Sequence, residues 1–229
     1  MKIIAHGCGS DRYPALTVLS ARHSLASGAD YAELDVRFTS DGTPVVCHDD
    51  NALSLFGSQE KIADLTRDEF LALRRRSDPA FPSHTLEDFF RAGVKRLVLH
   101  LKVGGDRVGE VLSLCRRCEC LGDVVFGVQS PADAERVRRY GKSLLTLAFM
   151  PSPEDLPAFC ESGVDFVRFW EKEDWLTPEN FALAASHGKP VWIMTRNPTV
   201  GVTTDENLRK WKAAGVDGVL LNKVEGRSF

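Results

Sequence analysis

Short hydrophobic runs recur along the whole chain and alternate with longer amphipathic stretches. The runs are rich in Val, Ile, Leu and Phe, and each is bounded by Gly, Pro, Asp or Ser, which is typical of buried β-strands. Nine runs are predicted to be strands: residues 2–6, 31–38, 43–48, 96–102, 124–129, 144–149, 165–170, 190–195 and 217–221.

The stretches between most of these runs carry signals for helix starts. Ser130-Pro131 and Thr177-Pro178 place a capping side chain before a first-turn proline, and Ser152-Pro153 does so more loosely. Strands that alternate with helices predict a parallel sheet, and about eight such units predict its closure into a barrel. We therefore expect an α/β fold, a (β/α)₈ TIM barrel, formed as a single domain by residues 1–229.

Two features do not fit a regular barrel. Nine strand candidates compete for eight places, and only a short turn that includes Ser40-Asp41-Gly42 separates the second candidate from the third. That spacing suggests a hairpin, because a parallel pair normally needs a longer crossover. We nevertheless predict a short parallel crossover over residues 37–44, since a hairpin is expected to turn His48 away from the other polar strand ends. Residues 49–95, with helix patterns at 66–75 and 86–92, are predicted to form a small insertion or lid after the third strand.

Composition and charge narrow the class of protein. Hydrophobic residues make up 43% of the chain, and 29 basic and 32 acidic residues leave a net charge of −3, which does not indicate a nucleic-acid partner. No apolar run approaches the roughly 18 residues of a membrane span, and the start of the chain does not resemble a secretory signal, so we expect a cytoplasmic protein. Cys115, Cys118 and Cys120 lack a matching Cys or His pair for a zinc site, and partly buried helical thiols are the simpler interpretation.

Polar residues capable of catalysis gather at the ends of the first four predicted strands. His6 ends the first strand, His48 ends the third, and Glu33 and Asp35 stand two residues apart on the second, so both point to one face. His100 and Lys102 form a similar pair near the end of the fourth strand. In a TIM barrel all these strand ends meet at the face that carries the active site.

The residue types in this group suggest metal-assisted phosphoryl chemistry. Two buried carboxylates repel each other unless a cation is bound between them, and hard divalent cations prefer oxygen ligands. Two histidines beside such a cation have the pKa needed for a general acid and a general base. Lys102 adds a positive charge for an oxyanion. A lone histidine or E-x-D pair is weak support, but the combination of His6, Glu33 with Asp35, and His48 within the first 50 residues is much more specific.

The combined pattern resembles the glycerophosphodiester phosphodiesterase family. The resemblance is strongest from residue 28 to 49, where Gly-Ala-Asp, Glu33-Leu-Asp35-Val, Asp41-Gly42 and His48-Asp follow the family's G-A-D-x-x-E-x-D-V-x-x-T-x-D-G-x-x-V-V-x-H-D motif. Weaker likenesses at residues 85–88, 101–102, 192–195 and 215–219 extend it over most of the chain. The resemblance implies hydrolysis of a glycerophosphodiester to sn-glycerol 3-phosphate and an alcohol, dependent on a divalent metal, Mg or Ca.

The family motif also implies a role for each matching residue. His6 and His48 correspond to the acid–base pair, and Lys102 to a phosphate contact. Trp192 corresponds to an apolar wall against the glycerol. The implied metal ligands are Glu33, Asp35 and His100.

Several positions depart from the family pattern. Gly7 stands where the family has a phosphate-binding arginine, Ala15 replaces a carboxylate, and Asn222 replaces an aspartate. His100 replaces the third acidic ligand, and an imidazole ligand favours Mn or Zn. We hypothesise that Arg168 replaces the lost arginine at the phosphate, the alternative being a surface arginine paired with Glu171.

Three functions follow from these observations. The first is an active hydrolase with a small-molecule phosphodiester as substrate. The second is a catalytically impaired barrel that binds a phosphorylated metabolite or a partner, as the departures at residues 7, 15 and 100 suggest. The third is a phosphodiester lyase of the sphingomyelinase D type, to which the 28–49 segment corresponds less closely. No oligomeric state is predicted.

Overall fold

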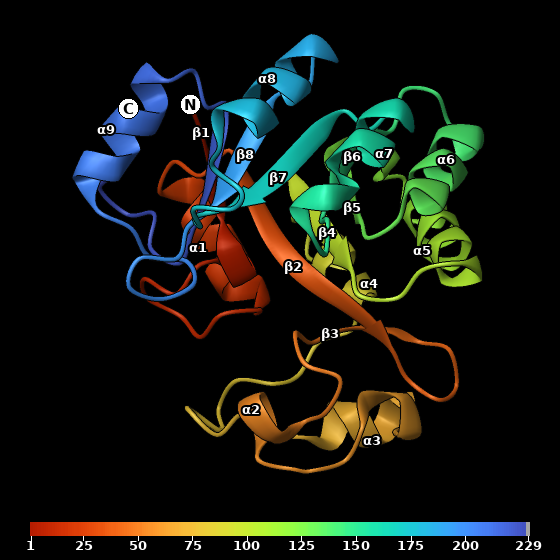
Figure 1. Ribbon diagram of the computed structural model, residues 1–229. Coiled ribbons are helices and arrows are strands. Elements are labelled where there is room, and N and C mark those ends of the chain that lie inside the picture. Colours follow the sequence, from red (N-terminus) through yellow and green to blue (C-terminus); the bar gives the residue numbers. More distant parts are fainter. Residues whose placement is uncertain (228–229) are drawn as a thin grey trace.

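Eight parallel strands close into a barrel in the computed structural model, which describes residues 1–227 (Figure 1). Ser228 and Phe229, which the single-domain prediction includes, lie outside the described residues. The strands are β1 (Lys2–Ala5), β2 (Tyr31–Phe38), β3 (Pro44–Val46), β4 (Leu97–Leu101), β5 (Val124–Val128), β6 (Leu145–Ala148), β7 (Phe166–Trp170), β8 (Val191–Met194) and β9 (Gly218–Leu221).

The order of the strands confirms the predicted TIM barrel. Each strand from β4 to β9 pairs in parallel with the next, β9 pairs with β1, and β2 joins β1 to β4. The third candidate strand is the extra one, because among the strands of residues 1–227 β3 pairs only with β2 and is not part of the closed barrel.

Helices surround the barrel and begin where the sequence predicts. Ser130 and Thr177 accept hydrogen bonds from the first turns of α6 and α8, and a proline follows each of them. The helices are α1 (Val18–Ala26), α2 (Leu53–Phe56), α3 (Arg67–Ala72), α4 (Leu86–Arg91), α5 (Asp106–Arg117), α6 (Pro131–Tyr140), α7 (Leu156–Glu161), α8 (Pro178–Ser186) and α9 (Asp205–Ala213). Short 3₁₀ turns span His6–Cys8, Ile62–Asp64, Leu121–Asp123 and Pro153–Asp155.

The alternation of residues along β2 explains how charges come to lie inside the barrel. Ala32, Leu34 and Val36 face the helices and belong to the main hydrophobic core. Glu33 and Asp35 therefore point to the interior. Deeper in the barrel the interior is filled by an apolar cluster that includes Ile4, Val98, Val125, Leu147, Trp192 and Leu220.

The predicted parallel crossover over residues 37–44 is wrong, and a hairpin is present. β3 runs antiparallel to β2, with Val36 opposite Val46, and the turn closes with Gly42 at a φ of 80°. The hairpin does not turn His48 away from the other strand ends. β2 extends beyond its pairing with β4, which ends at Val36, and the chain then returns beside it until the Cys47 N–H donates to the Asp35 carbonyl (3.1 Å). The hairpin thus brings the next residue, His48, back to the level of Asp35.

The insertion predicted after the third strand forms a small lobe below the barrel in Figure 1. It contains α2 and α3 and has a hydrophobic cluster of its own, which includes Phe56, Ile62, Leu65 and Phe70. α3 is shorter than the predicted helix at 66–75, whereas α4 matches the pattern at 86–92 closely.

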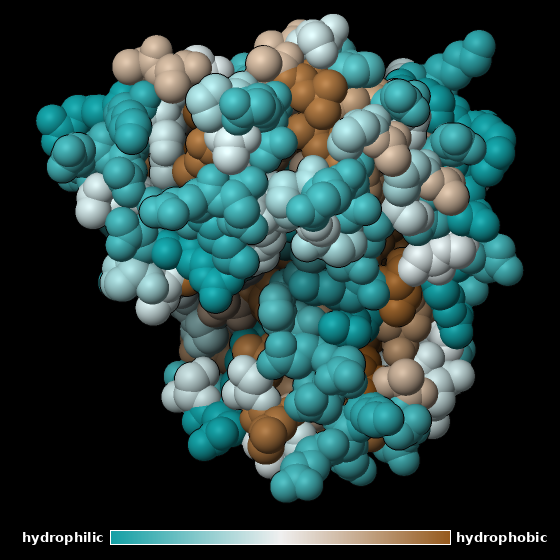
Figure 2. Space-filling view, in the orientation of Figure 1, coloured by the Kyte–Doolittle hydropathy of each residue, from teal (hydrophilic) through white to brown (hydrophobic). Residues whose placement is uncertain are grey.

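The surface of the molecule is mostly polar on the face shown in Figure 2. Apolar atoms appear there in small groups. None of the helices within residues 1–227 combines the length and the apolar composition needed to cross a bilayer. Cys115, Cys118 and Cys120 are free thiols at and just beyond the end of α5.

Candidate active site

Four residues on two neighbouring strands form what we call the acidic wall of the site: Glu33, Asp35, His100 and Lys102. Asp35 lies opposite His100 in the register of β2 and β4, and its Oδ1 is 3.0 Å from both His100 Nδ1 and Lys102 Nζ. Glu33 Oε1 is 3.8 Å from His100 Nδ1. Both carboxylates are almost fully buried. The parallel register therefore brings together the two residue pairs that the sequence analysis selected.

The two carboxylates are equally buried but differ in their pKa, because their charged and hydrogen-bonding neighbours differ. Loss of solvent, together with the nearby Asp35, raises the pKa of Glu33 to about 8. Burial opposes ionisation of Asp35 too, but the hydrogen bond from His100 and the charge of Lys102 hold its pKa well below its usual range. Burial lowers the pKa of His100 to about 4, so the imidazole is neutral at pH 7. The wall thus has a firmly ionised Asp35 beside a Glu33 that favours a proton or a cation.

The His100 ring is held on its other sides by β5 and β6. It stacks on Phe149 with ring centres 3.8 Å apart and planes within 13°. Gly127, opposite His100 on β5, makes room for this stack, because a Cβ there would lie 2.5 Å from Phe149. His100 Nε2 is 3.1 Å from the Gln129 side-chain amide. Since an amide offers both a donor and an acceptor, Gln129 can support either tautomer of His100.

His6 lies in the 3₁₀ turn that follows β1. Its Nδ1 is 2.6 Å from Asn222 Oδ1, and the Asn222 amide is oriented by donating from Nδ2 to the Val200 carbonyl (2.8 Å). His6 Nδ1 is therefore the donor, and its Nε2 carries the lone pair. Burial lowers the pKa of His6, and the bond to Asn222 partly opposes that change. The turn is also attached to the acidic wall, since the Gly7 N–H donates to Glu33 Oε2 (2.8 Å).

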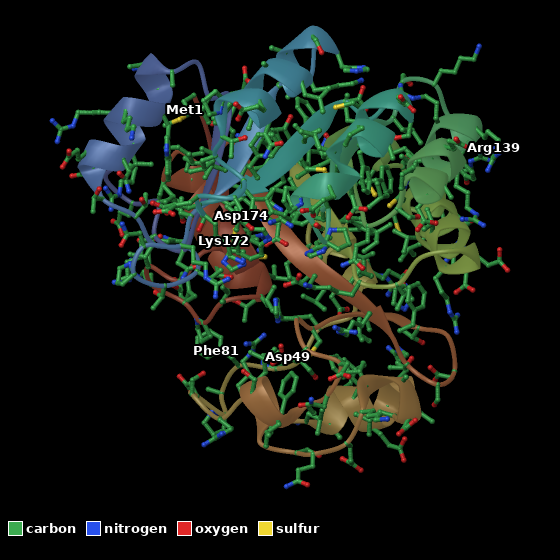
Figure 3. The ribbon with its side chains drawn as sticks, in the orientation of Figure 1. Met1, Asp49, Phe81, Arg139, Lys172 and Asp174 are labelled. Carbon is green, nitrogen blue, oxygen red and sulfur yellow. The ribbon has the colours of Figure 1, made fainter. Side chains whose placement is uncertain are left out.

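His48 directly follows the hairpin and is more exposed than His6. Its carbonyl accepts a hydrogen bond from Arg37 Nε (3.0 Å), which ties it to β2. Its Nδ1 is 2.6 Å from the Asp49 carboxylate. Asp49 marks this part of the lobe, where the lobe faces the barrel, in Figure 3. The two histidines thus have different partners, a neutral amide for His6 and a carboxylate for His48.

Arg168 faces the acidic wall from β7. It is only 4% exposed, and its guanidinium lies 4.5 Å from the ring centre of Trp170 and 5.2 Å from that of Phe149. We call Phe149, Arg168 and Trp170 the aromatic wall. Arg168 Nη2 makes a long bond of 3.4 Å to the Met150 carbonyl, whereas Nε and Nη1 have no hydrogen-bond partner among the described residues. Burial lowers the pKa of Arg168 to about 9.

The suggested ion pair between Arg168 and Glu171 is not formed. The Glu171 carboxylate instead accepts hydrogen bonds from the Arg196 N–H, the Thr203 hydroxyl and the Asn207 amide. Arg168 is left as a buried cation beside the site rather than a surface residue.

A cavity of about 460 Å³ joins these groups. His6, His48, the acidic wall and the aromatic wall all line it, together with Met194 and Val200. Phe149, Trp170 and Gln129 are not among the predicted site residues. All three end predicted strands, where a barrel carries its site, and that position is the sequence signal that points to them.

Trp192 does not reach this cavity, contrary to its predicted role as a wall against the glycerol. It is fully buried in the barrel interior, where its ring packs against Phe166 and Tyr31. Met194, two residues nearer the carboxyl end of β8, lines the cavity instead. Both residues point inward, but only the last inward residue of the strand reaches the mouth.

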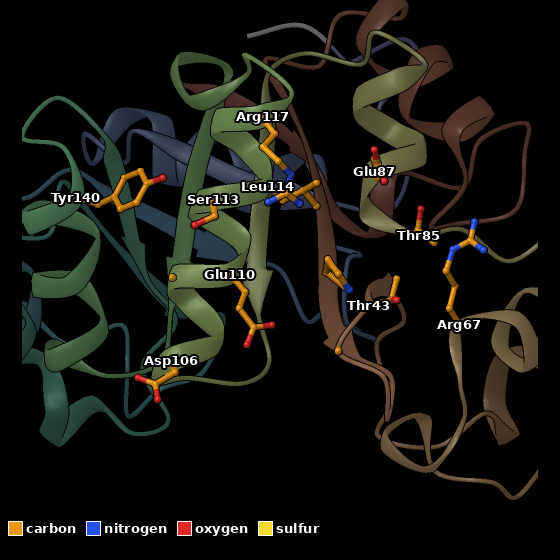
Figure 4. A pocket seen from close by; sticks show the side chains of 13 residues that line it. Thr43, Arg67, Thr85, Glu87, Asp106, Glu110, Ser113, Leu114, Arg117 and Tyr140 are labelled. Carbon is orange, nitrogen blue, oxygen red and sulfur yellow. The ribbon is translucent and has the colours of Figure 1, made fainter.

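A larger cavity, of about 700 Å³, lies between the hairpin and α5 (Figure 4). Its lining mixes Arg67, Arg117, Glu87 and Glu110 with Tyr140, and none of the predicted site residues contributes to it. The chemistry therefore favours the smaller cavity at the barrel mouth as the candidate active site.

The acidic wall has a donor set that fits a divalent cation. Glu33, Asp35 and His100 each offer one ligand atom, and these atoms all lie within 4.8 Å of one another. The pKa of Glu33, raised by burial and by Asp35, shows that a positive charge at this point would stabilise both carboxylates. The residues present thus fit a metal ion with mixed oxygen and nitrogen ligands.

The first part of the chain matches known sequences. The model of the glycerophosphoryl diester phosphodiesterase family matches residues 6–104. Glycerophosphodiester phosphodiesterase 1 of Rattus norvegicus is 36% identical over 87 residues, which cover 38% of this chain and 25% of that protein. A glycerophosphodiester phosphodiesterase of Bacillus altitudinis is 38% identical over 68 residues, covering 30% and 28% of the two chains. The chain thus matches about a quarter of the length of these relatives.

Solved structures resemble the whole barrel. The glycerophosphodiester phosphodiesterase of Thermotoga maritima has a TM-score of 0.75 at 22% identity, covering 97% of this chain and 95% of that one. The enzyme of that name from Agrobacterium tumefaciens gives 0.75 at 18%, covering 98% and 97%. At these identities the likeness shows the fold, which extends well beyond the segment matched in sequence.

Proposed function

We propose that the protein is a phosphoric diester hydrolase, because residues 6–104 match the model of the glycerophosphoryl diester phosphodiesterase family. It acts on a glycerophosphodiester, or a related phosphodiester, and releases sn-glycerol 3-phosphate and an alcohol. The observation that carries this proposal is the single cavity at the barrel mouth lined by two imidazoles, two carboxylates, an ammonium group and a guanidinium.

The partners of the two histidines support a division of roles. His6 carries its free lone pair on Nε2 and is kept neutral by burial, which suits a general base. The carboxylate of Asp49 at Nδ1 orients the His48 ring, which suits a general acid. His6 would take the proton of the glycerol 2-hydroxyl as that oxygen attacks phosphorus, and His48 would give a proton to the departing alcohol. Water then opens the cyclic phosphate with the two roles reversed.

Two cations on opposite sides of the cavity would bind the phosphate. Lys102 extends from the acidic wall, and Arg168 from the aromatic wall. The unpaired Nε and Nη1 of Arg168 are N–H donors that can each bind a phosphate oxygen. This arrangement would compensate for Gly7, which stands where the family pattern has an arginine.

The metal would be held by Glu33, Asp35 and His100. When bound, a divalent cation supplies positive charge for the phosphate oxygens and polarises the phosphorus centre. The family resemblance implies Mg or Ca, whereas the imidazole of His100 favours Mn or Zn. We propose that this chain prefers one of the latter pair.

A direct assay tests the hydrolase proposal. Purified protein is incubated with bis(p-nitrophenyl) phosphate and with glycerophosphodiesters in Mg, Ca, Mn or Zn, and the products are identified. Turnover with Mn or Zn is expected to exceed that with Mg. No turnover with any metal would leave the impaired, ligand-binding barrel, and lasting accumulation of a cyclic phosphate would identify a lyase.

A variant at His6 checks that the activity belongs to this site. His6→Gln removes the proposed base and is expected to lower kcat by about a thousandfold, within the usual range for general acid–base groups. His187→Gln, at an exposed histidine just after α8, is the matched control and should leave kcat unchanged. Equal activity of the two variants would place the chemistry elsewhere.

A further inference from the structure

The aromatic rings of the cavity are already in contact with cations of the protein itself. Trp170 has the Arg168 guanidinium 4.5 Å and the Arg196 guanidinium 5.6 Å from its ring centre. Phe149 is stacked on His100 and has Arg168 5.2 Å from its ring centre. These distances lie within the reach of a cation–π contact. The two rings that could otherwise surround a quaternary ammonium group are therefore already in contact with side chains of the protein.

Arg196 is held at the rim by a well-anchored loop. Its backbone N–H donates to Glu171 Oε2 (2.6 Å), and it forms a bridge pair with Val200, which lines the cavity. The Val200 carbonyl in turn accepts from Asn222, the residue that orients His6. The loop that carries Arg196 thus shares an anchor with the proposed catalytic base.

Nearby carboxylates do not neutralise these two guanidinium groups. Glu171 is engaged by Thr203 and Asn207 as well as by the Arg196 backbone. Lys172 and Asp174 follow β7 in the chain (Figure 3), and Lys172 Nζ lies 5.9 Å from the Trp170 ring centre. Within residues 1–227 neither Arg168 nor Arg196 takes part in an ion pair. Two guanidinium groups thus remain available beside Trp170.

We propose that the preferred substrate is a phosphodiester whose second alcohol carries an anionic group. In this arrangement, which rests on the proposed hydrolase function, the diester phosphate contacts Arg168. The anionic group of the alcohol contacts the Arg196 guanidinium, which lies beside Trp170. A cationic alcohol such as choline would meet two guanidinium groups and no open aromatic face, so it would be disfavoured by charge as well as by contact.

A matched pair of substrates tests this proposal. Glycerophosphoinositol 4-phosphate and glycerophosphoinositol differ by one phosphate on the alcohol, and glycerophosphocholine supplies the cationic case. We expect kcat/KM to be about fivefold higher for the phosphorylated member of the pair, in keeping with one added exposed charge contact, and lowest for the choline diester. Turnover of the choline diester at an equal or higher kcat/KM would overturn the inference while leaving the hydrolase intact. Lack of turnover of all three would instead contradict the proposed function.

Arg196→Gln locates the effect. This exposed residue lies outside the proposed catalytic groups, and its backbone contact to Glu171 is kept. The preference for the phosphorylated substrate is expected to fall about three- to fivefold, while turnover of glycerophosphoinositol is unchanged. Arg209→Gln, at an exposed arginine on α9, is the control and should keep the full preference.

Salt offers a second measurement on the unaltered protein. Raising the salt concentration from 50 to 500 mM should weaken the preference for the phosphorylated substrate, because it screens exposed charges. A preference that survives both high salt and Arg196→Gln would overturn the assignment of Arg196.

Discussion

The two walls of the cavity treat buried charge in opposite ways. On the acidic wall, Asp35 Oδ1 lies 3.0 Å from both His100 and Lys102, and Glu33 accepts from the Gly7 backbone. On the aromatic wall, two of the three guanidinium nitrogens of Arg168 lack a hydrogen-bond partner in the described part of the chain. The acidic wall thus pairs the charge of Asp35 within itself, and its Glu33 favours a proton or a cation, whereas the aromatic wall holds a cation without a partner among the described residues.

Because of this difference, the charges of the acidic wall are expected to contribute to folding stability, whereas Arg168 is expected to contribute to binding at a cost in stability. A buried charge with partners supports the fold as long as every partner is present, because removal of one leaves the other uncompensated. A buried polar group without partners costs free energy in the folded state and is retained where binding repays that cost. Loss of a charge should therefore have opposite effects on the free energy of unfolding at the two walls.

The largest expected effect of this kind is at Lys102. Lys102→Met leaves Asp35 and Glu33 buried with one cation fewer and should lower the free energy of unfolding by about 3 kcal/mol at pH 7, as for other broken buried pairs. Lys102 helps to hold the pKa of Asp35 below its ordinary value of 3.8. That part of the stability is present above pH 3.8 and lost as the pH falls through the lower pKa of the folded state. The deficit of the variant should therefore shrink only in acid.

Urea unfolding between pH 3 and pH 8, with a chelator present, measures this deficit. Lys142→Met, at an exposed lysine between α6 and β6, is the control and should unfold like the parent protein. If Lys102→Met were as stable as this control at pH 7, the acidic wall would not depend on its ion pair.

The next effect has the opposite sign and concerns Arg168. Arg168→Met keeps an apolar side chain of similar length among Phe149, Trp170 and Trp175. It removes unpaired buried N–H groups that cost about 1–3 kcal/mol each, against a cation–π gain of about 0.5–2 kcal/mol. We expect the variant to be about 1 kcal/mol more stable and at least about a hundredfold less active, since its phosphate contact is gone.

Urea unfolding and kcat/KM on one protein preparation test both parts of this prediction. Arg139→Met, on the outside of α6 (Figure 3), should change neither quantity. A variant at Arg168 that lost stability together with activity would show that the guanidinium has a structural role that its long bond to Met150 does not reveal.

The acidic wall was predictable from the sequence, and the aromatic wall largely was not. Strand periodicity places Glu33 and Asp35 on one face, and the 28–49 segment resembles a family motif that names them together with His48. Arg168 was selected only as compensation for Gly7. No motif contains Phe149, Trp170 or Gln129. In the sequence, an aromatic residue at a strand end cannot be told apart from a residue of the hydrophobic core.

Two predictions are wrong, the parallel crossover at residues 37–44 and the role of Trp192, and both depend on three-dimensional geometry that the local sequence does not show. The length of β2 determines where a hairpin returns the chain, and the sequence does not show that β2 extends past its pairing with β4. Trp192 and Met194 both point inward from β8, and the stagger of neighbouring strands decides which one reaches the mouth. Secondary structure could therefore be predicted, whereas depth within the barrel could not.

The smallest expected effect is a change in the pH dependence of activity, and it concerns Asn222. This residue directly follows β9, which pairs with β1 between the strands of the two walls. Its neutral Oδ1 accepts from His6, whereas the family pattern has an aspartate there. Asn222→Asp adds a negative charge at 2.6 Å, which favours the imidazolium and should raise the pKa of His6. A base must be unprotonated to act, so the acidic limb of kcat/KM against pH should move to higher pH.

The opposite substitution makes this test decisive. Asn222→Ala removes the hydrogen bond that partly opposes the effect of burial on His6, so the acidic limb should move to lower pH while kcat falls because the ring is no longer oriented. Shifts of the two variants in opposite directions would identify the group that titrates as His6. A limb that stays in place in both variants would mean that the proton is taken by another group, and His48, with Asp49 at its Nδ1, would then be the candidate for the base.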